Sequence, residues 1–162
     1  MRALLALTVF GGGVAHATLA PAIRIGEVAP DIPLVLVTLL ALRRGPDVGC
    51  LAGFVAGLLQ DAAGGGLLGV QAMTKAVAGF LLGLAADQLN PRQPLVQVPA
   101  LVILSLAEGL GRYALLALFH YPAPFADLMV YVVVPQALYN GFLGAALVLM
   151  LAWAESQRRR PA

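Results

Sequence analysis

Charged side chains are scarce in this chain. Of its 162 residues only 11% are charged, whereas 60% are hydrophobic, and the mean hydropathy is +0.89. An ordinary soluble domain carries about 25% charged residues. A soluble fold of this length has too little interior to hide so much apolar surface from water. The scarcity of charge therefore excludes a soluble globular domain and indicates helices that face lipid.

Cysteine and histidine are rare as well. The single cysteine, Cys50, allows no intrachain disulfide. The two histidines, His16 and His120, have no cysteine or carboxylate neighbours to complete a metal site. No paired catalytic residues occur, and the glycine run at 64–66 lacks the preceding strand and the following Lys-Ser/Thr of a phosphate-binding loop. These gaps argue against an enzyme, a metal site and a cofactor.

The hydropathy pattern predicts a single transmembrane domain over residues 1–162. Six apolar runs lie at about 3–23, 28–42, 46–60, 69–86, 95–119 and 126–154. A full crossing takes about 20 residues, so the second and third runs are short, and we expect them to cross as a tight pair. A single re-entrant hairpin is the alternative for this pair. The prediction is an all-α, polytopic six-helix transmembrane bundle with both termini on one side.

The basic residues indicate which side is cytoplasmic, because cytoplasmic loops are enriched in lysine and arginine. With the N-terminus in the cytoplasm, only Arg24 lies on the outer side. Seven arginines then lie on the inner side. Five of them are predicted topology anchors, namely Arg43, Arg44, Arg158, Arg159 and Arg160, and the other two are Arg2 and Arg92. The C-terminal tail also contacts anionic lipid, and it is too short to indicate nucleic-acid binding.

The N-terminus allows a second interpretation. Arg2, the apolar run and Ala15-His16-Ala17 resemble a signal peptide with a small-x-small cleavage site. Cleavage would leave five spans and an outer N-terminus. The apolar run continues past that site to Ile23, which favours a retained first span.

Glycines recur at intervals of four residues in the third and fourth runs. In the third run the glycines are Gly45, Gly49, Gly53 and Gly57, and Asp61 continues the spacing. In the fourth run they are Gly79 and Gly83, which lie at the same interval between Lys75 and Asp87. Gly69 lies in the turn between the two runs. Small residues at this interval let helix backbones approach closely in lipid. The pattern favours packing of these two helices against each other. A docking face for another membrane protein is the second interpretation.

Charges inside the apolar runs are expensive in a bilayer and therefore informative. Lys75 lies in the fourth run, and Glu108 and Arg112 lie four residues apart in the fifth, on one helix face. We expect the three to form one intramembrane polar cluster in the outer half of the bundle. An internal ion pair is the simpler interpretation, and a ligand pocket or a partner-facing site is the alternative. Gln136 and Asn140, one turn apart, are expected to hydrogen-bond across helices.

The stretch from Pro30 to Gly83 resembles MreD, the bacterial rod shape-determining membrane protein. The matching elements are Pro30-Asp31 before a short span, the segment GFVAGLLQD at 53–61, and Leu68-Gly69. A basic C-terminus after a sixth span with Asn140-Gly141 is also similar. The resemblance covers about a third of the chain well and the rest by hydropathy.

This resemblance implies a non-enzymatic adaptor of the cell-elongation machinery for peptidoglycan, in the bacterial cytoplasmic membrane with both termini cytoplasmic. It implies MreC as the direct partner, and RodA, a class B penicillin-binding transpeptidase and MreB in the wider complex. It also implies a fold similar to the substrate-binding subunits of energy-coupling-factor transporters. The alternative function is a small-molecule-binding subunit of a membrane transporter.

Overall fold

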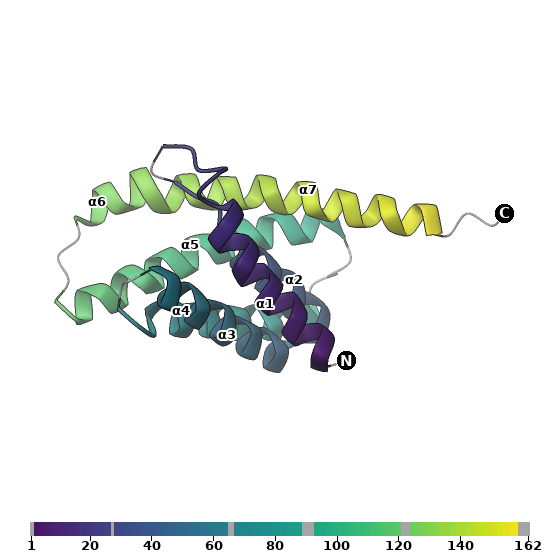
Figure 1. Cartoon of the computed structure of the whole chain (residues 1–162), viewed down its shortest axis with the longest axis horizontal. Coiled ribbons are helices and arrows are strands. Elements are labelled where there is room, and N and C mark those ends of the chain that lie inside the picture. The colour runs from purple at the N-terminus through teal and green to yellow at the C-terminus, as the bar shows by residue number, and fades with distance from the viewer. Residues whose placement is uncertain (1, 27, 65–66, 89–92, 121–123, 159–162) are drawn as a thin grey trace.

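The structure, a computed structural model, describes residues 2–26, 28–64, 67–88, 93–120 and 124–158. Within these ranges the only extended pairing is an isolated bridge between Ile25 and Val28. The helices are α1 (Arg2–Leu19), α2 (Ile32–Arg44), α3 (Pro46–Gly64), α4 (Val70–Ala85), η1 (Ala86–Gln88), α5 (Pro94–Leu118), α6 (Phe125–Leu128), η2 (Met129–Val133) and α7 (Val134–Arg158). Because α6, the π-helical η2 and α7 run on without a break, the chain forms six rods, which confirms the predicted all-α, six-helix class (Figure 1).

Four helix ends differ by four residues from the expected runs: the end of α1, the start of α2, and the ends of α3 and α7. α1 ends at Leu19 rather than at residue 23, because Pro21 follows and cannot continue a helix. α3 continues past residue 60 to Gly64 and includes the buried Asp61.

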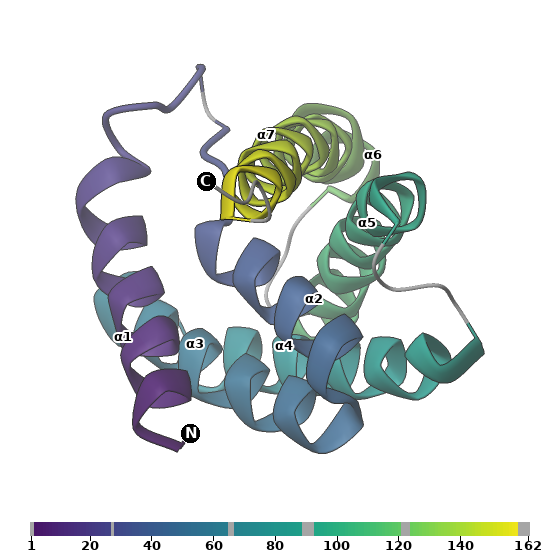
Figure 2. The same ribbon diagram turned by 90° about the vertical axis from the view of Figure 1, so that its right-hand side faces the viewer.

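The short second run is the central helix of the bundle. Figure 2 shows α2 surrounded by α1, α3, α4, α5 and α7. Its 13 residues rise by about 20 Å, less than the ~30 Å of a hydrocarbon core. Most of α2 is buried or half-buried up to Leu42, and its N-terminus lies among the other helices.

A single residue separates α2 from α3. Gly45 has a φ of 86°, a left-handed conformation that glycine adopts without strain, and its N–H donates to the carbonyl of Ala41. Pro46 then starts α3 at the first helical position, where the missing N–H costs nothing. The predicted tight turn at Arg43 to Pro46 is thus built from these two residues.

Several polar side chains are buried in the bundle together with an apolar core, and many large apolar side chains are exposed on its outside. Lys75 and Asn140 are fully buried, whereas Phe142 is 76% exposed and Leu7 is 70% exposed. Two segments, Val96–Leu118 and Phe125–Met150, are long and apolar enough to cross a membrane, and the apolar stretches Leu7–Leu19 and Val70–Ala85 are shorter. Such an arrangement is stable where the surrounding solvent is lipid, because lipid accepts apolar side chains and excludes unpaired polar ones.

Candidate functional site: a buried polar network beside a cavity

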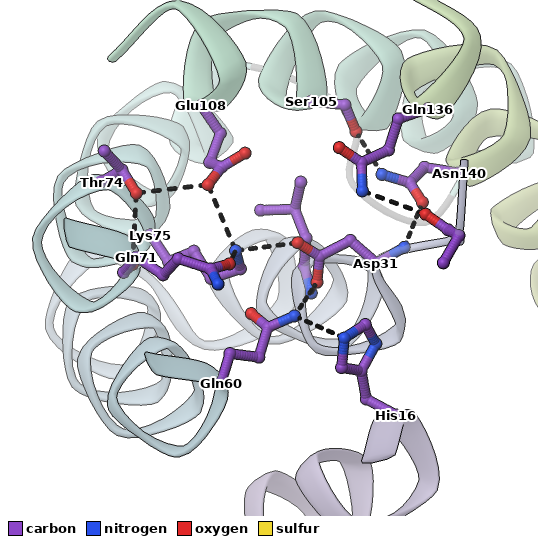
Figure 3. A network of polar contacts seen from close by, with 12 residues as sticks. His16, Asp31, Gln60, Gln71, Thr74, Lys75, Ser105, Glu108, Gln136 and Asn140 are labelled. Atoms are coloured by element: carbon purple, nitrogen blue, oxygen red, sulfur yellow. Dashed lines mark hydrogen bonds and ion pairs between the residues drawn. The ribbon is translucent and has the colours of Figure 1, made fainter. Parts of the chain in front are cut away.

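Lys75 is the centre of a buried polar network. Its Nζ lies 2.8 Å from Asp31 Oδ2 and 3.2 Å from Glu108 Oε1, and it donates a hydrogen bond of 2.9 Å to Gln71 Oε1 (Figure 3). The two carboxylates come from the N-terminus of α2 and the middle of α5, so one ammonium group joins α2, α4 and α5. The three donors of the ammonium are all used, as a charge removed from water requires.

Asp31 is the charged residue of this network that the sequence prediction missed. One of its carboxylate oxygens caps α2 by accepting from the N–H of Leu34 at 3.0 Å, and the same oxygen accepts from Gln60 Nε2 at 3.2 Å. Its backbone N–H donates to Asn140 Oδ1 at 2.7 Å. Aspartate before an apolar run is a helix N-cap signal, and that signal was available in the sequence. Its pairing with Lys75, which is distant in the sequence, was not.

Asn140 and Gln136 extend the network to α7. Asn140 forms the predicted hydrogen bond across helices, whereas Gln136 bonds to the non-helical segment before α2. Asn140 Nδ2 donates to Ser105 Oγ on α5 at 3.1 Å, and Gln136 Nε2 donates to the carbonyl of Ala29 at 3.0 Å. These bonds hold the segment before α2 against α7. The structure therefore gives Ser105 a hydrogen-bonding role between helices.

Arg112 lies outside this network, although the sequence grouped it with Lys75 and Glu108. The carboxylate of Glu108 instead accepts from Lys75 and from Thr74 Oγ1, at 3.2 Å each. Arg112 is half-buried, and it makes no hydrogen bond or ion pair with any residue that the structure describes. The expected cluster therefore consists of Lys75, Glu108 and Asp31, with Arg112 as a neighbouring cation.

A cavity of about 480 Å³ lies beside the network, in the size range of small-ligand sites. It is at the end of the bundle where α1 and α3 end and α2 and α4 begin, opposite the Arg43-Arg44 turn. Its polar lining comes from His16, Arg24, Asp31, Gln60, Gln71, Arg112 and Gln136. The exposed residues Ala17 and Pro21 also line it, so the cavity opens to the molecular surface.

The glycines of α3 and α4 bring the two backbones into contact in an antiparallel register. A Cβ atom at Gly53 would overlap the backbone of Lys75 and Ala76, and one at Gly57 would overlap that of Gln71 and Ala72. The remaining close approaches in this interface are Gly49 with Gly79 and Gly83 with Pro46. In this structure the glycine pattern serves packing inside the chain. Gly45 and Gly69 have positive φ and open space around them, so they serve turns.

Asp61 caps α4 from the end of α3. Its carboxylate accepts from the backbone N–H groups of Gly69 at 2.8 Å, Gln71 at 3.2 Å and Ala72 at 3.2 Å. Asp61 is 5% exposed, so its carboxylate is buried near the end of α3. It satisfies the N–H groups that the start of α4 leaves without helical partners.

Replacing Asp61 with alanine is expected to lower the free energy of unfolding by about 2–3 kcal/mol, because buried N–H groups lose a charged acceptor. Asp61→Asn keeps one acceptor oxygen and is expected to lose less. Thermal unfolding of the purified variants in one detergent measures this difference. Equal melting temperatures for Asp61→Ala and the parent chain would contradict the capping role.

The predicted arginine anchors lie at helix ends or outside the described residues. Arg43 and Arg44 are exposed in the last turn of α2, and Arg158 is the last residue of α7. Arg159 and Arg160 lie outside the described residues. Within the part of the chain that the structure describes, no group of three His, Cys, Asp or Glu side chains is placed to hold a metal ion.

Comparison with protein families identifies a match over nearly the whole chain. The family described as "rod shape-determining protein MreD" matches residues 1–153. No curated protein and no solved structure matches the chain, so the similarity to energy-coupling-factor subunits stays a prediction. The family match extends well beyond the stretch from Pro30 to Gly83 that suggested it, and it agrees with a helical bundle whose outside exposes large apolar side chains. The chain therefore belongs to the MreD family of rod shape-determining membrane proteins.

Proposed function

We propose that this protein is a non-enzymatic membrane adaptor of the bacterial cell-elongation machinery, and that it binds MreC and helps to maintain rod shape. RodA, a class B penicillin-binding transpeptidase and MreB belong to the wider complex in this proposal. Family membership supports the cell-shape role. An adaptor needs a rigid fold with an outer surface left for a partner, and the buried network supplies the rigidity.

The proposed setting is the bacterial cytoplasmic membrane, crossed six times with both termini in the cytoplasm. The start of α1 and the end of α7 lie toward the same side of the bundle, on the right in Figure 1, which supports this orientation. The exposed arginines of the α2–α3 turn agree with a cytoplasmic location for that turn. The cavity then lies in the outer half of the membrane.

Gly11 of α1 is the residue that supports a contact between α1 and a partner helix. Gly12 faces Leu36 of α2, and Gly13 faces Leu59 of α3, whereas Gly11 is exposed with no atom within 4 Å of its Cβ direction. Glycine inside a helix costs about 0.5–1 kcal/mol relative to alanine. No residue that the structure describes uses the space at Gly11. Close approach of a partner helix, as small residues permit in membranes, accounts for it.

Gly11→Leu is expected to reduce recovery of MreC with the tagged protein at least about tenfold, because the leucine side chain occupies the space of the partner backbone. The fold should be unaffected, since a Cβ at this position meets no atom within 4 Å. Co-purification from native membranes, quantified by mass spectrometry, measures the effect. The matched control is Ala107→Leu, a small exposed residue of α5 changed in the same way. Undiminished MreC in the Gly11→Leu sample would contradict the proposed contact.

The cavity favours a second candidate function, a small-molecule-binding subunit of a membrane transporter. Its volume and its polar lining are those of a ligand site. Ligand binding and the adaptor role are compatible, because the cavity and Gly11 are separate.

A further inference from the structure

Arg112 supplies a positive charge to the cavity that no anion in the described residues neutralises at close range. Glu108, one turn away on α5, is bound to Lys75 and Thr74, and Asp31 is bound to Lys75. A cation at this depth normally has a partner, because an unpaired charge within a bilayer is expensive. Both carboxylates near Arg112 are thus occupied, and the described residues do not supply the group that would complete its charge.

Gln60 lines the same cavity and contains a buried hydrogen-bond acceptor that is unused. The side chain is 7% exposed, and its Oε1 accepts no hydrogen bond from the described residues. The amide is oriented by Nε2, which donates to Asp31 at 3.2 Å and lies 3.0 Å from His16 Nε2 (Figure 3). A buried acceptor without a donor costs about 1–3 kcal/mol. Oε1 is itself covered, so a ligand hydroxyl or amino group would satisfy it when the side chain turns this atom toward the cavity.

The cavity is shaped by rigid elements. Val132 of the π-helical segment and Gln136 of α7 form one wall, and π-helical turns often mark functional sites. Pro135 follows this segment and lacks the N–H that a regular α-helical turn would use there. A second cation, Arg24, lines the exposed part of the cavity near Ala17. The lining therefore combines two guanidinium groups, those of Arg24 and Arg112, with the amide of Gln60.

We propose that the cavity binds a phosphate-bearing ligand, with the phosphate at Arg112 and Arg24 and a neighbouring hydroxyl or amino group of the ligand donating to Gln60 Oε1. Arginine is suited to this because its guanidinium group binds phosphate oxygens in a bidentate manner. Asp31 is the only carboxylate among the described residues that line the cavity, and it is held by Lys75 and does not compete. A lipid headgroup and a soluble phosphate ester share this chemistry. The proposal does not depend on the adaptor role.

The test uses the full-length protein in a maltoside detergent, which carries no phosphate. Glycerol 3-phosphate and phosphatidylglycerol are titrated separately, with chloride at matched ionic strength and diacylglycerol as blanks. We expect one of the two phosphate probes to give a saturable rise in the melting temperature of roughly 5 °C at about a hundred times its Kd. A rise with phosphatidylglycerol alone assigns a lipid headgroup. A rise with glycerol 3-phosphate assigns a soluble ester. No saturable rise with either probe overturns the proposal.

Variants show whether the rise comes from this cavity. Arg112→Gln is expected to abolish the rise, and Arg44→Gln, at the opposite end of the bundle, is expected to leave it unchanged. Ala17→Phe narrows the opening without touching the polar network and is expected to weaken apparent affinity at least about tenfold, so it serves if Arg112→Gln does not fold. An unchanged titration in Arg112→Gln or Ala17→Phe overturns the assignment to this cavity.

Discussion

Replacing Lys75 with methionine is expected to prevent accumulation of folded protein. Methionine fills a similar volume, but Asp31 and Glu108 then remain 2% and 3% exposed with their ammonium partner gone. Removing one member of a buried ion pair costs about 3–5 kcal/mol, and here two carboxylates lose the same partner. That loss approaches the whole free energy of unfolding of many proteins, about 5–15 kcal/mol. Fluorescence-detected size-exclusion chromatography of membrane extracts measures the folded fraction.

A triple variant separates the charge from the shape of this site. Lys75→Met combined with Asp31→Asn and Glu108→Gln leaves no uncompensated charge, and the asparagine introduced before α2 would still be able to cap that helix through its side-chain oxygen. We expect it to recover a monodisperse peak that the single variant lacks. If Lys75→Met alone behaves like the parent chain, the ion pairs contribute little and the network is held by its neutral hydrogen bonds.

The sequence predicted those features that depend on local pattern. Hydropathy located six rods because each rod is a contiguous apolar run, and lipid imposes that requirement on every span. The four-residue spacing from Gly45 to Asp61 predicted close packing, because that spacing places small residues on one helix face. The structure shows the packing partner as α4, with Gly53 against Lys75 and Gly57 against Gln71.

Prediction from the sequence failed where side chains from distant segments compete for the same partner. Glu108 and Arg112 are four residues apart on one helix, a spacing that favours an ion pair, yet Lys75 and Thr74 from α4 occupy the carboxylate. Asp31 was placed only at the start of a span, because nothing near it in the sequence indicates a lysine partner. A ligand pocket was only an alternative interpretation of the polar cluster, and its lining could not be predicted, since the lining comes from separate segments that only the tertiary fold brings together.

Gly53→Leu is expected to disrupt the fold itself, with a loss of more than about 3 kcal/mol in the free energy of unfolding. Any Cβ at this position overlaps the backbone of Lys75 and Ala76, and a backbone cannot rotate away as a flexible side chain can. Separating α3 from α4 to admit leucine would also move Lys75 away from its carboxylates, so the packing and the polar network would fail together. Melting temperature and the monodisperse fraction in detergent measure this loss.

Gly11→Leu is the matched comparison, because it makes the same change at a helical glycine with nothing within 4 Å. It is expected to keep the melting temperature of the parent chain while losing the partner, whereas Gly53→Leu loses the fold and for that reason everything bound to it. A Gly53→Leu protein that stays monodisperse, with an unchanged melting temperature, would show that the α3–α4 contact is not tight. The glycines of α3 and α4 would then be the candidate contact for a partner helix, in place of Gly11 on α1.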